Sequence, residues 1–227
     1  MIFNSVKRLQ KPVTRNRLPI TFDILQQICR KLKSGIFSTF TDCMLFTTFV
    51  VAFYRFLRFG EFTVHDARLF DKEFNVCLSD ISVQSDYAVI HLKQSKTDPF
   101  RNGVDIQLHR LNHELCLYTA LNTYLMLRKA KGLFQSYDPL FINESGQALE
   151  RNFFIRKLKH LLDLCGHDSQ LYNGHSFRIG AATSAEKNNI EDHLIKILGR
   201  WNSSSYCRYI KTCKSVIKKA QQKLLSF

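Results

Sequence analysis

The sequence predicts an α+β fold that is mostly helical, with one small antiparallel sheet of three strands near the front of the domain. Apolar residues recur at helical spacing over most of the 227 residues, whereas residues 87–108 alternate between apolar and polar positions. With 45% hydrophobic residues, 9 glycines and 4 prolines, the chain can bury a sizeable core and has few residues that interrupt helices. This composition excludes a disordered or low-complexity chain.

The first segment and the helices that follow differ in character. Residues 1–18 are basic and lack periodicity, which indicates an extended lead-in to a single domain at 19–227. Thr21 is suited to cap a first helix and Gly35 to end it. Residues 40–56 form a second, strongly apolar helix, which we expect in the core because a spanning helix needs about 20 apolar residues. The apolar face of the first helix consists of Ile24, Leu25, Ile28 and Leu32.

A β-hairpin is expected in the middle of the chain. Residues 87–96 alternate apolar with polar side chains, and residues 104–108 do so again. Between them, residues 97–103 contain Asp-Pro and Asn-Gly steps that are typical of a turn. Residues 76–83 supply a third strand, and the basic Lys96 lies at the tip of the hairpin.

The second half of the sequence returns to the helical period. Shorter helices are expected from His175, from Ile190 and around Ser203, and residues 214–225 form a last amphipathic helix. Two longer helices have the apolar positions Leu115, Leu117, Leu121, Tyr124, Leu125 and Leu127, and Phe153, Phe154, Leu158, Leu161 and Leu162.

Charge and cysteine content narrow the function. The 33 lysines and arginines exceed the 19 acidic residues by 14, which indicates a polyanionic partner, most often nucleic acid and less often an anionic membrane surface; charge alone does not choose between them. Seven scattered cysteines without a Cys-x-x-Cys motif indicate reduced thiols. Because no apolar signal segment opens the sequence, we expect an intracellular protein that is not secreted.

Several kinds of site are not predicted. The sequence has no P-loop, no zinc-ligand spacing and no cluster of carboxylates for a two-metal nuclease. His109 and His113 lack a third ligand and fall at an expected strand-to-helix junction. We therefore expect no metal, no cofactor and no small-molecule substrate, and chemistry that depends on cationic side chains.

Four short segments attract attention through their order. Singly, each has an ordinary explanation, such as an arginine at the solvated end of a core helix or an exposed lysine in a turn. They are Arg-Phe-Leu-Arg-Phe-Gly-Glu at 55–61, Ser-Lys-Thr-Asp at 95–98, His-x-x-Arg at 175–178, and Gly-Arg-Trp at 199–201 with Tyr206 and Tyr209 after it. Together they form the series Arg, Lys, His-x-x-Arg, Gly-x-Trp and Tyr, ending near the C-terminus.

This series resembles the tyrosine recombinase, or phage integrase, family. The Ser-Lys-Thr-Asp-Pro-Phe hairpin and the Gly-Arg-Trp variant look most like the recombinases of Crypton- and DIRS-type mobile elements. The resemblance covers residues 18–215, which correspond to the catalytic domain of the family. It implies the fold of that domain and a reaction that cuts and rejoins DNA through a 3′-phosphotyrosine link, without metal or ATP.

The resemblance also implies the site residues: Arg58, Lys96, His175, Arg178, Trp201 and Tyr209. Tyr209 would attack the phosphate, and Arg58 and Arg178 would hold its non-bridging oxygens, for which forked guanidinium donors are suited. Tyr206 stays open as the nucleophile, since residues three apart share a helix face; we prefer Tyr209 for its Arg-Tyr-Ile context.

The remaining roles concern proton transfer and support. Lys96 would protonate the departing 5′ oxygen, with Lys93 on the same strand as the alternative. His175 would contact the phosphate or carry a proton. Trp201 stands where many family members have His, and its indole N–H can donate one hydrogen bond. Glu61 would brace the turn at Arg58 through a buried polar contact.

Family members carry an N-terminal helical domain that closes around DNA, and the sequence before residue 18 is too short for it. We therefore expect either a fragment of a longer protein or a truncated or domesticated copy, and the alternative function is DNA binding without catalysis by such a truncated or domesticated protein. The expected partners are double-stranded DNA and, on the DNA, further copies of the chain as a dimer or tetramer, with no membrane. A nuclear location is expected from the mobile-element resemblance and the basic lead-in.

Overall fold

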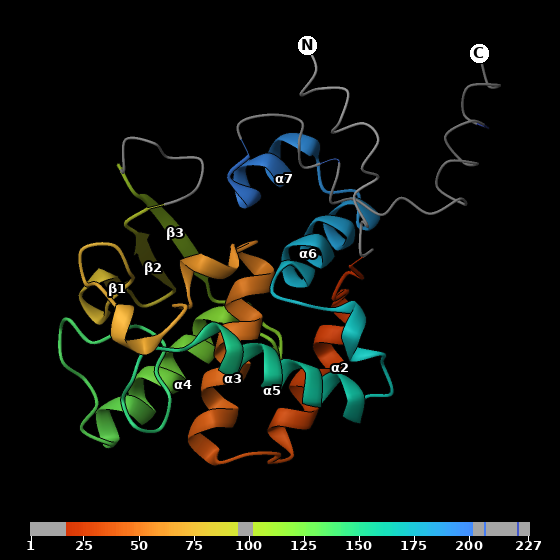
Figure 1. Cartoon of the computed structure of the whole chain (residues 1–227). Helices are drawn as coiled ribbons and strands as arrows, with labels where there is room; N and C mark the ends of the chain where they lie inside the picture. Colours follow the sequence, from red (N-terminus) through yellow and green to blue (C-terminus); the bar gives the residue numbers. More distant parts are fainter. Residues whose placement is uncertain (1–16, 95–101, 202–206, 208–221, 223–227) are drawn as a thin grey trace, which may run out of the picture.

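The computed structural model describes residues 17–94, 102–201, 207 and 222. Helices dominate, and one sheet lies at the edge of the molecule (Figure 1). The helices are α2 (Phe22–Lys33), α3 (Thr39–Tyr54), α4 (Leu117–Ala130), α5 (Arg151–Leu164), α6 (His175–Lys187) and α7 (Asp192–Gly199). The strands are β1 (Ile81–Val83), β2 (Tyr87–Leu92) and β3 (Val104–His109), and short 3-10 turns are η1 (Phe59–Glu61), η2 (Ala67–Leu69), η3 (Leu78–Asp80) and η4 (Ser169–Leu171). The α+β, mostly helical class with a three-stranded antiparallel sheet is confirmed.

Helix α2 begins and ends where its sequence indicates. The Thr21 hydroxyl accepts a hydrogen bond from the backbone N–H of Ile24, which satisfies one of the free donors of the first turn. Gly35 follows the helix with φ +77°, a conformation that glycine adopts at little cost.

Helix α3 runs through the core. It is apolar on every side, so it packs against α2, α4 and α6 at once. The helix ends at Tyr54, two residues earlier than expected, because Phe56 takes a left-handed φ of +48° and turns the chain. That turn carries the chain out of the core toward Arg58.

The sheet has the order β1-β2-β3, with both pairings antiparallel. The alternation predicted for β2 and β3 is confirmed, because its apolar positions face the core. Buried on that face are Ala88, Ile90, Leu92, Ile106 and Leu108. The third strand is shorter than the expected 76–83, because residues 78–80 form η3, where the Asp80 carboxylate accepts the backbone N–H of Cys77 at 2.7 Å.

In the second half of the chain, several helices begin at other residues, or have other lengths, than the sequence predicts. The helix expected around residues 115–127 begins at Leu117, the one expected from Ile190 begins at Asp192, and the one from His175 is a full 13 residues long. The helices expected around Ser203 and over 214–225 lie outside the described residues.

Helix α6 packs unusually closely on the chain before α2. A Cβ atom at Gly180 would lie 1.7 Å from the carbonyl oxygen of Ile20, so only glycine permits this approach. The backbone N–H of Ile20 donates to the carbonyl of Ser176 at 2.9 Å, which fixes the first turns of α6 against this segment.

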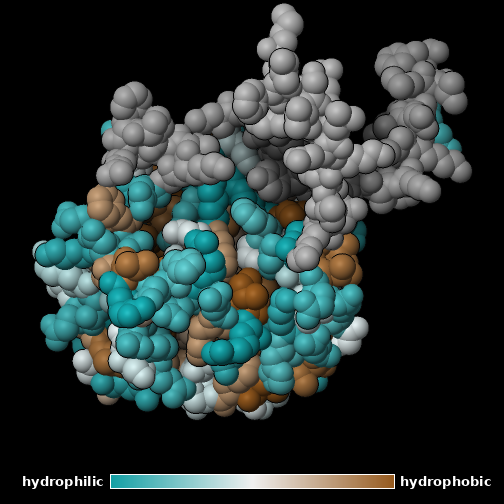
Figure 2. Space-filling view, in the orientation of Figure 1, coloured by the Kyte–Doolittle hydropathy of each residue, from teal (hydrophilic) through white to brown (hydrophobic). Residues whose placement is uncertain are grey.

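The molecular surface is mainly hydrophilic on the face shown in Figure 2, with apolar side chains in small separate groups. Within the described ranges, no helix is both long and apolar enough to cross a bilayer.

Candidate functional site

Three segments that are far apart in the sequence meet in one place. They are the turn after α3 at 55–61, the first turns of α6, and residues 199–201 at the end of α7; α6 and α7 lie together at one end of the molecule (Figure 1). The guanidinium of Arg178 joins all three, since it donates to the carbonyl of Phe56 and, at 2.5 Å, to that of Gly199. Three of the four segments singled out in the sequence are therefore neighbours in space.

Arg58 is held by the carboxylate of Glu61. The Arg58 backbone N–H donates to Glu61 Oε2 at 2.8 Å, and its guanidinium donates to Oε1 at 3.1 Å. The side chains are 16% and 5% exposed, respectively, so the pair is largely shielded from water. This is the bracing contact expected of Glu61, and it fixes the start of η1.

Arg178 lies one helical turn after His175. The side chain of Arg178 is buried and its guanidinium carbon lies 4.0 Å from the centre of a Trp201 ring. His175 is exposed at the first position of α6, where its backbone N–H donates to Asn173 Oδ1 at 2.9 Å. Gly174 lets α6 begin against η1, because a Cβ there would lie 2.4 Å from the Phe59 ring.

Trp201 is a packing residue in this structure. Its ring is 7% exposed and meets the Phe56 ring edge-to-face at 5.7 Å, in addition to covering the Arg178 guanidinium. Gly199 is required two residues earlier, because a Cβ there would lie 1.7 Å from the Trp201 ring. Trp201 thus orients Arg178, a role that the sequence did not indicate.

Two further arginines, Arg55 and Arg200, belong to the cluster, and neither was assigned a role from the sequence. Arg200 adopts a left-handed φ of +54° at the end of α7 and donates to Glu61 Oε2 at 2.6 Å and to the Arg55 carbonyl at 2.9 Å. Burial lowers the pKa of Arg200; the carboxylate of Glu61 opposes this shift and the charge of Arg58 adds to it. The sequence did contain a signal for Arg200, because it is the cation at the centre of the Gly-Arg-Trp motif, beside the expected site.

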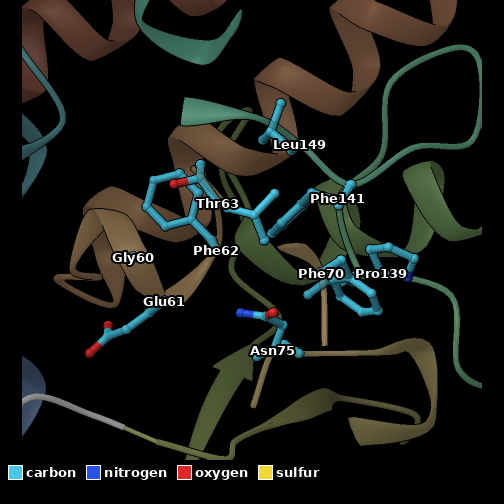
Figure 3. Close-up of a pocket in the computed structure, with 13 residues that line it drawn as sticks. Gly60, Glu61, Phe62, Thr63, Phe70, Asn75, Pro139, Phe141 and Leu149 are labelled. Atoms are coloured by element: carbon cyan, nitrogen blue, oxygen red, sulfur yellow. The ribbon is translucent and has the colours of Figure 1, made fainter. Parts of the chain in front are cut away.

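A small cavity of about 30 Å³ lies behind the turn, which is room for about one or two water molecules (Figure 3). Gly60, Thr63, Asn75 and Phe141 are among the residues that line it. The Glu61 side chain points away from the other residues that line this cavity (Figure 3), and its carboxylate accepts from Arg58 and Arg200. The cavity is therefore part of the packing behind the turn and not the site itself.

No family model matches the sequence, and no curated protein does. Solved structures match most of the chain. XerH site-specific recombinase bound to palindromic difH substrate superimposes with a TM-score of 0.68 at 13% identity over 93% of this chain, and XerA recombinase with 0.65 at 18% over 95%. The fold is that of a tyrosine recombinase catalytic domain.

The tyrosine recombinase fold accounts for nearly all of this chain but only part of its neighbours. The chain spans 54% of the XerH structure and 66% of the XerA structure. The Tn1549 transposon integrase in complex with transposon right end DNA gives a TM-score of 0.62 at 11% identity, with 98% of this chain and 70% of that one covered. At these identities the likeness shows the fold alone.

Of the remaining residues predicted for the site, the structure describes only some. Lys96, Tyr206 and Tyr209 lie outside the described residues. Lys93 is paired with Asp80 at 2.8 Å and donates to the carbonyl of Asn75 at 3.3 Å. Burial disfavours the charge on Lys93, but the hydrogen bond and charge of Asp80 outweigh it and raise the pKa.

The surroundings of Lys93 make it a poor proton donor. A raised pKa and a carboxylate at hydrogen-bond distance both hold the proton on the amine. Lys96 therefore stays the preferred general acid, as a prediction.

Across the described ranges, no three His, Cys, Asp or Glu side chains are grouped as metal ligands would be.

Proposed function

We propose that this chain is the catalytic domain of a site-specific DNA recombinase or integrase that cuts and rejoins DNA through a phosphotyrosine at Tyr209. The observation that carries the proposal is the meeting of two segments at one end of a tyrosine recombinase fold: Arg178, on the helix that His175 begins, donates to the carbonyl of Phe56 in the turn that leads to Arg58. The sequence supplies a lysine at a hairpin tip and a tyrosine after α7, in the order that this reaction uses.

The proposed chemistry needs cations around one phosphate. A tyrosine hydroxyl with a pKa near 10 is a weak nucleophile until positive charge lies beside it. Preorganised arginine donors stabilise the phosphorane oxygens, each by roughly 3–4 kcal/mol when placed where charge develops. Lys96 protonates the 5′ oxygen, and His175 contacts the phosphate or relays a proton. The energy of the broken bond is kept in the ester, so the reaction uses neither ATP nor a metal.

The proposed substrate is double-stranded DNA. The net charge of +14 suits it, and among the structural neighbours lambda integrase was solved as a dimer bound to a COC′ core site. We extend the proposal to assembly of this chain as a dimer or tetramer on DNA. The Ser-Lys-Thr-Asp-Pro-Phe and Gly-Arg-Trp segments further support a Crypton- or DIRS-type recombinase, acting in the nucleus.

A suicide substrate tests the reaction. DNA nicked near the cleavage site loses its short 5′-hydroxyl fragment after attack, so a covalent protein–DNA adduct accumulates and is counted on a denaturing gel. Tyr209→Phe should abolish the adduct, while Tyr206→Phe serves as the matched control and should retain it. Equal adduct from wild type and Tyr209→Phe would exclude Tyr209 as the nucleophile.

A second candidate function is DNA binding without catalysis. It is favoured by the burial of Arg178, which is 1% exposed and donates to two backbone carbonyls. This reading predicts salt-sensitive DNA binding with no adduct on nicked substrate and no relaxation of supercoiled plasmid in the absence of magnesium and ATP. Relaxation of the plasmid under those conditions would rule it out.

A further inference from the structure

Arg55 is a partly buried cation that the structure leaves unneutralised. It directly follows α3, and its Nε is buried without a hydrogen-bond acceptor. Within the described ranges, its guanidinium forms neither a hydrogen bond nor an ion pair. Burial of a charged group without a partner is costly, and an arginine cannot escape the cost by losing its proton at neutral pH.

A structural arginine in the same chain looks different. Arg128 is 0% exposed, and its guanidinium donates to the carbonyls of Leu133, Pro139 and Leu140 at 2.8, 2.6 and 2.8 Å. It also lies 3.4 Å from the carboxylate of Asp138. Arg128 therefore shows how this fold satisfies an arginine that serves packing, and Arg55 lacks every one of these partners.

The neighbours of Arg55 increase its need for an anion. The Arg55 carbonyl accepts from Arg200, whose own Nε is buried without an acceptor. The one carboxylate of the cluster, Glu61, is already shared by Arg58 and Arg200. Burial first, and the positive charge of Arg200 second, lower the pKa of Arg55 to about 10. The cluster thus holds an excess of positive charge on the Arg55 side.

We propose that Arg55, together with Arg200, forms a second anion subsite that binds a backbone phosphate of DNA next to the phosphate held by Arg58. The inference rests on the proposed function for its DNA ligand. Arg55 precedes Arg58 by three residues, and three residues span at most about 11 Å. One turn of chain can therefore contact two neighbouring phosphates, which fixes the register of the strand as well as the reacting group.

The sign of a stability change tests this proposal. Arg55→Met removes an unpaired cation but keeps the apolar stem, so in sulfate- and phosphate-free buffer it should leave the Tm unchanged or raise it. Added sodium sulfate should stabilise wild type more than the variant. Arg30→Met is the charge-matched control, because Arg30 is exposed on α2 and has Glu114 as a partner at 3.7 Å.

DNA binding gives the second readout. The slope of log K against log salt should fall in magnitude by about 0.9 in Arg55→Met, the value for one lost phosphate contact on duplex DNA, and should keep its wild-type value in Arg30→Met. A lower Tm with an unchanged slope would make Arg55 structural and overturn the proposal. Sulfate stabilisation that depends on Arg55 without a change in slope would also overturn it, by showing a site for free anions only.

The two proposals fail separately. If wild type binds DNA and forms no adduct, the strand-transfer reaction is wrong, while the slope still decides the role of Arg55. If adduct forms and the slope of Arg55→Met equals that of wild type, the reaction stands and the second subsite falls.

Discussion

The guanidinium of Arg200 lies 2.6 Å from the carboxylate of Glu61, which precedes it by 139 residues. The two side chains are 10% and 5% exposed, so the ion pair is buried. Because Glu61 also holds the backbone and guanidinium of Arg58, this pair connects the end of α7 with the turn that carries Arg58. Arg200 thus acts on Arg58 through a shared carboxylate, which makes it a positioning residue in the proposed reaction.

The first prediction concerns the stability of this pair. Glu61→Gln leaves two buried arginines without their countercharge and should lower the free energy of unfolding by about 3–5 kcal/mol in chemical denaturation. Glu114→Gln is the control, since Glu114 pairs with the exposed Lys33 and Arg30, and it should change stability little. Equal small effects of the two substitutions would show that the buried pair contributes nothing particular.

The second prediction concerns Arg200 itself. Arg200→Gly relieves the left-handed backbone but removes both contacts, so it should retain the fold while the rate of adduct formation falls roughly 100-fold, as misplaced reacting groups do. Arg200→Lys keeps a charge near Glu61 but lacks the fork that also reaches the Arg55 carbonyl, so it should recover only part of that rate.

The cleavage rate at saturating DNA, measured apart from DNA affinity, distinguishes a loss of positioning from general damage to the protein. Both Arg200 variants should show a lower cleavage rate at saturating DNA. The matched control is Arg68→Gly, at an exposed arginine that pairs with Asp66, which should keep the wild-type rate. A wild-type rate in Arg200→Gly would show that Arg58 needs no help from Arg200.

The sequence predicted those parts of the fold and site that depend on local pattern. The faces of α2, β2 and β3 follow from periodicity, and the contact of Arg178 with the turn that leads to Arg58 brings together two of the motifs singled out from the sequence. The roles of Arg55 and Arg200 depend on two left-handed residues, Phe56 and Arg200, and on contacts made across more than a hundred residues. Periodicity does not contain that information, because a positive φ at a residue other than glycine is imposed by tertiary packing and not by local sequence.

The third prediction uses the sole tryptophan of the chain as a reporter. Trp201 is 7% exposed, so its fluorescence should be blue-shifted in the native protein and move to the red on unfolding. Gly199→Ala places a Cβ 1.7 Å from the ring and should displace it, which gives a red-shifted native spectrum and less adduct. Gly132→Ala is the control for spectral position, because it strains the backbone at a φ of +71° while its Cβ meets nothing within 4 Å. Identical native spectra for Gly199→Ala and wild type would contradict this account of the ring.

The last prediction separates Lys93 from Lys96 as the general acid. The raised pKa of Lys93 means that its pairing with Asp80 stabilises the fold fully below the unfolded pKa of lysine, and that this stability is lost as the pH rises through the folded pKa. Lys93→Met should therefore lower the free energy of unfolding at pH 8, with the difference from wild type shrinking in strongly alkaline solution.

The cleavage rate should depend on Lys96 and not on Lys93, whereas the stability described above depends on Lys93. Lys96→Met should slow cleavage of ordinary DNA about 100-fold or more, the usual contribution of a general acid, while Lys93→Met keeps a near wild-type rate once folded. A substrate with sulfur in place of the 5′ bridging oxygen needs no acid, because a thiolate leaves readily. That substrate should restore the rate of Lys96→Met. If it instead restores Lys93→Met, and Lys96→Met cleaves ordinary DNA normally, the proton comes from the lysine that the structure holds against Asp80, and that ion pair must open during the reaction.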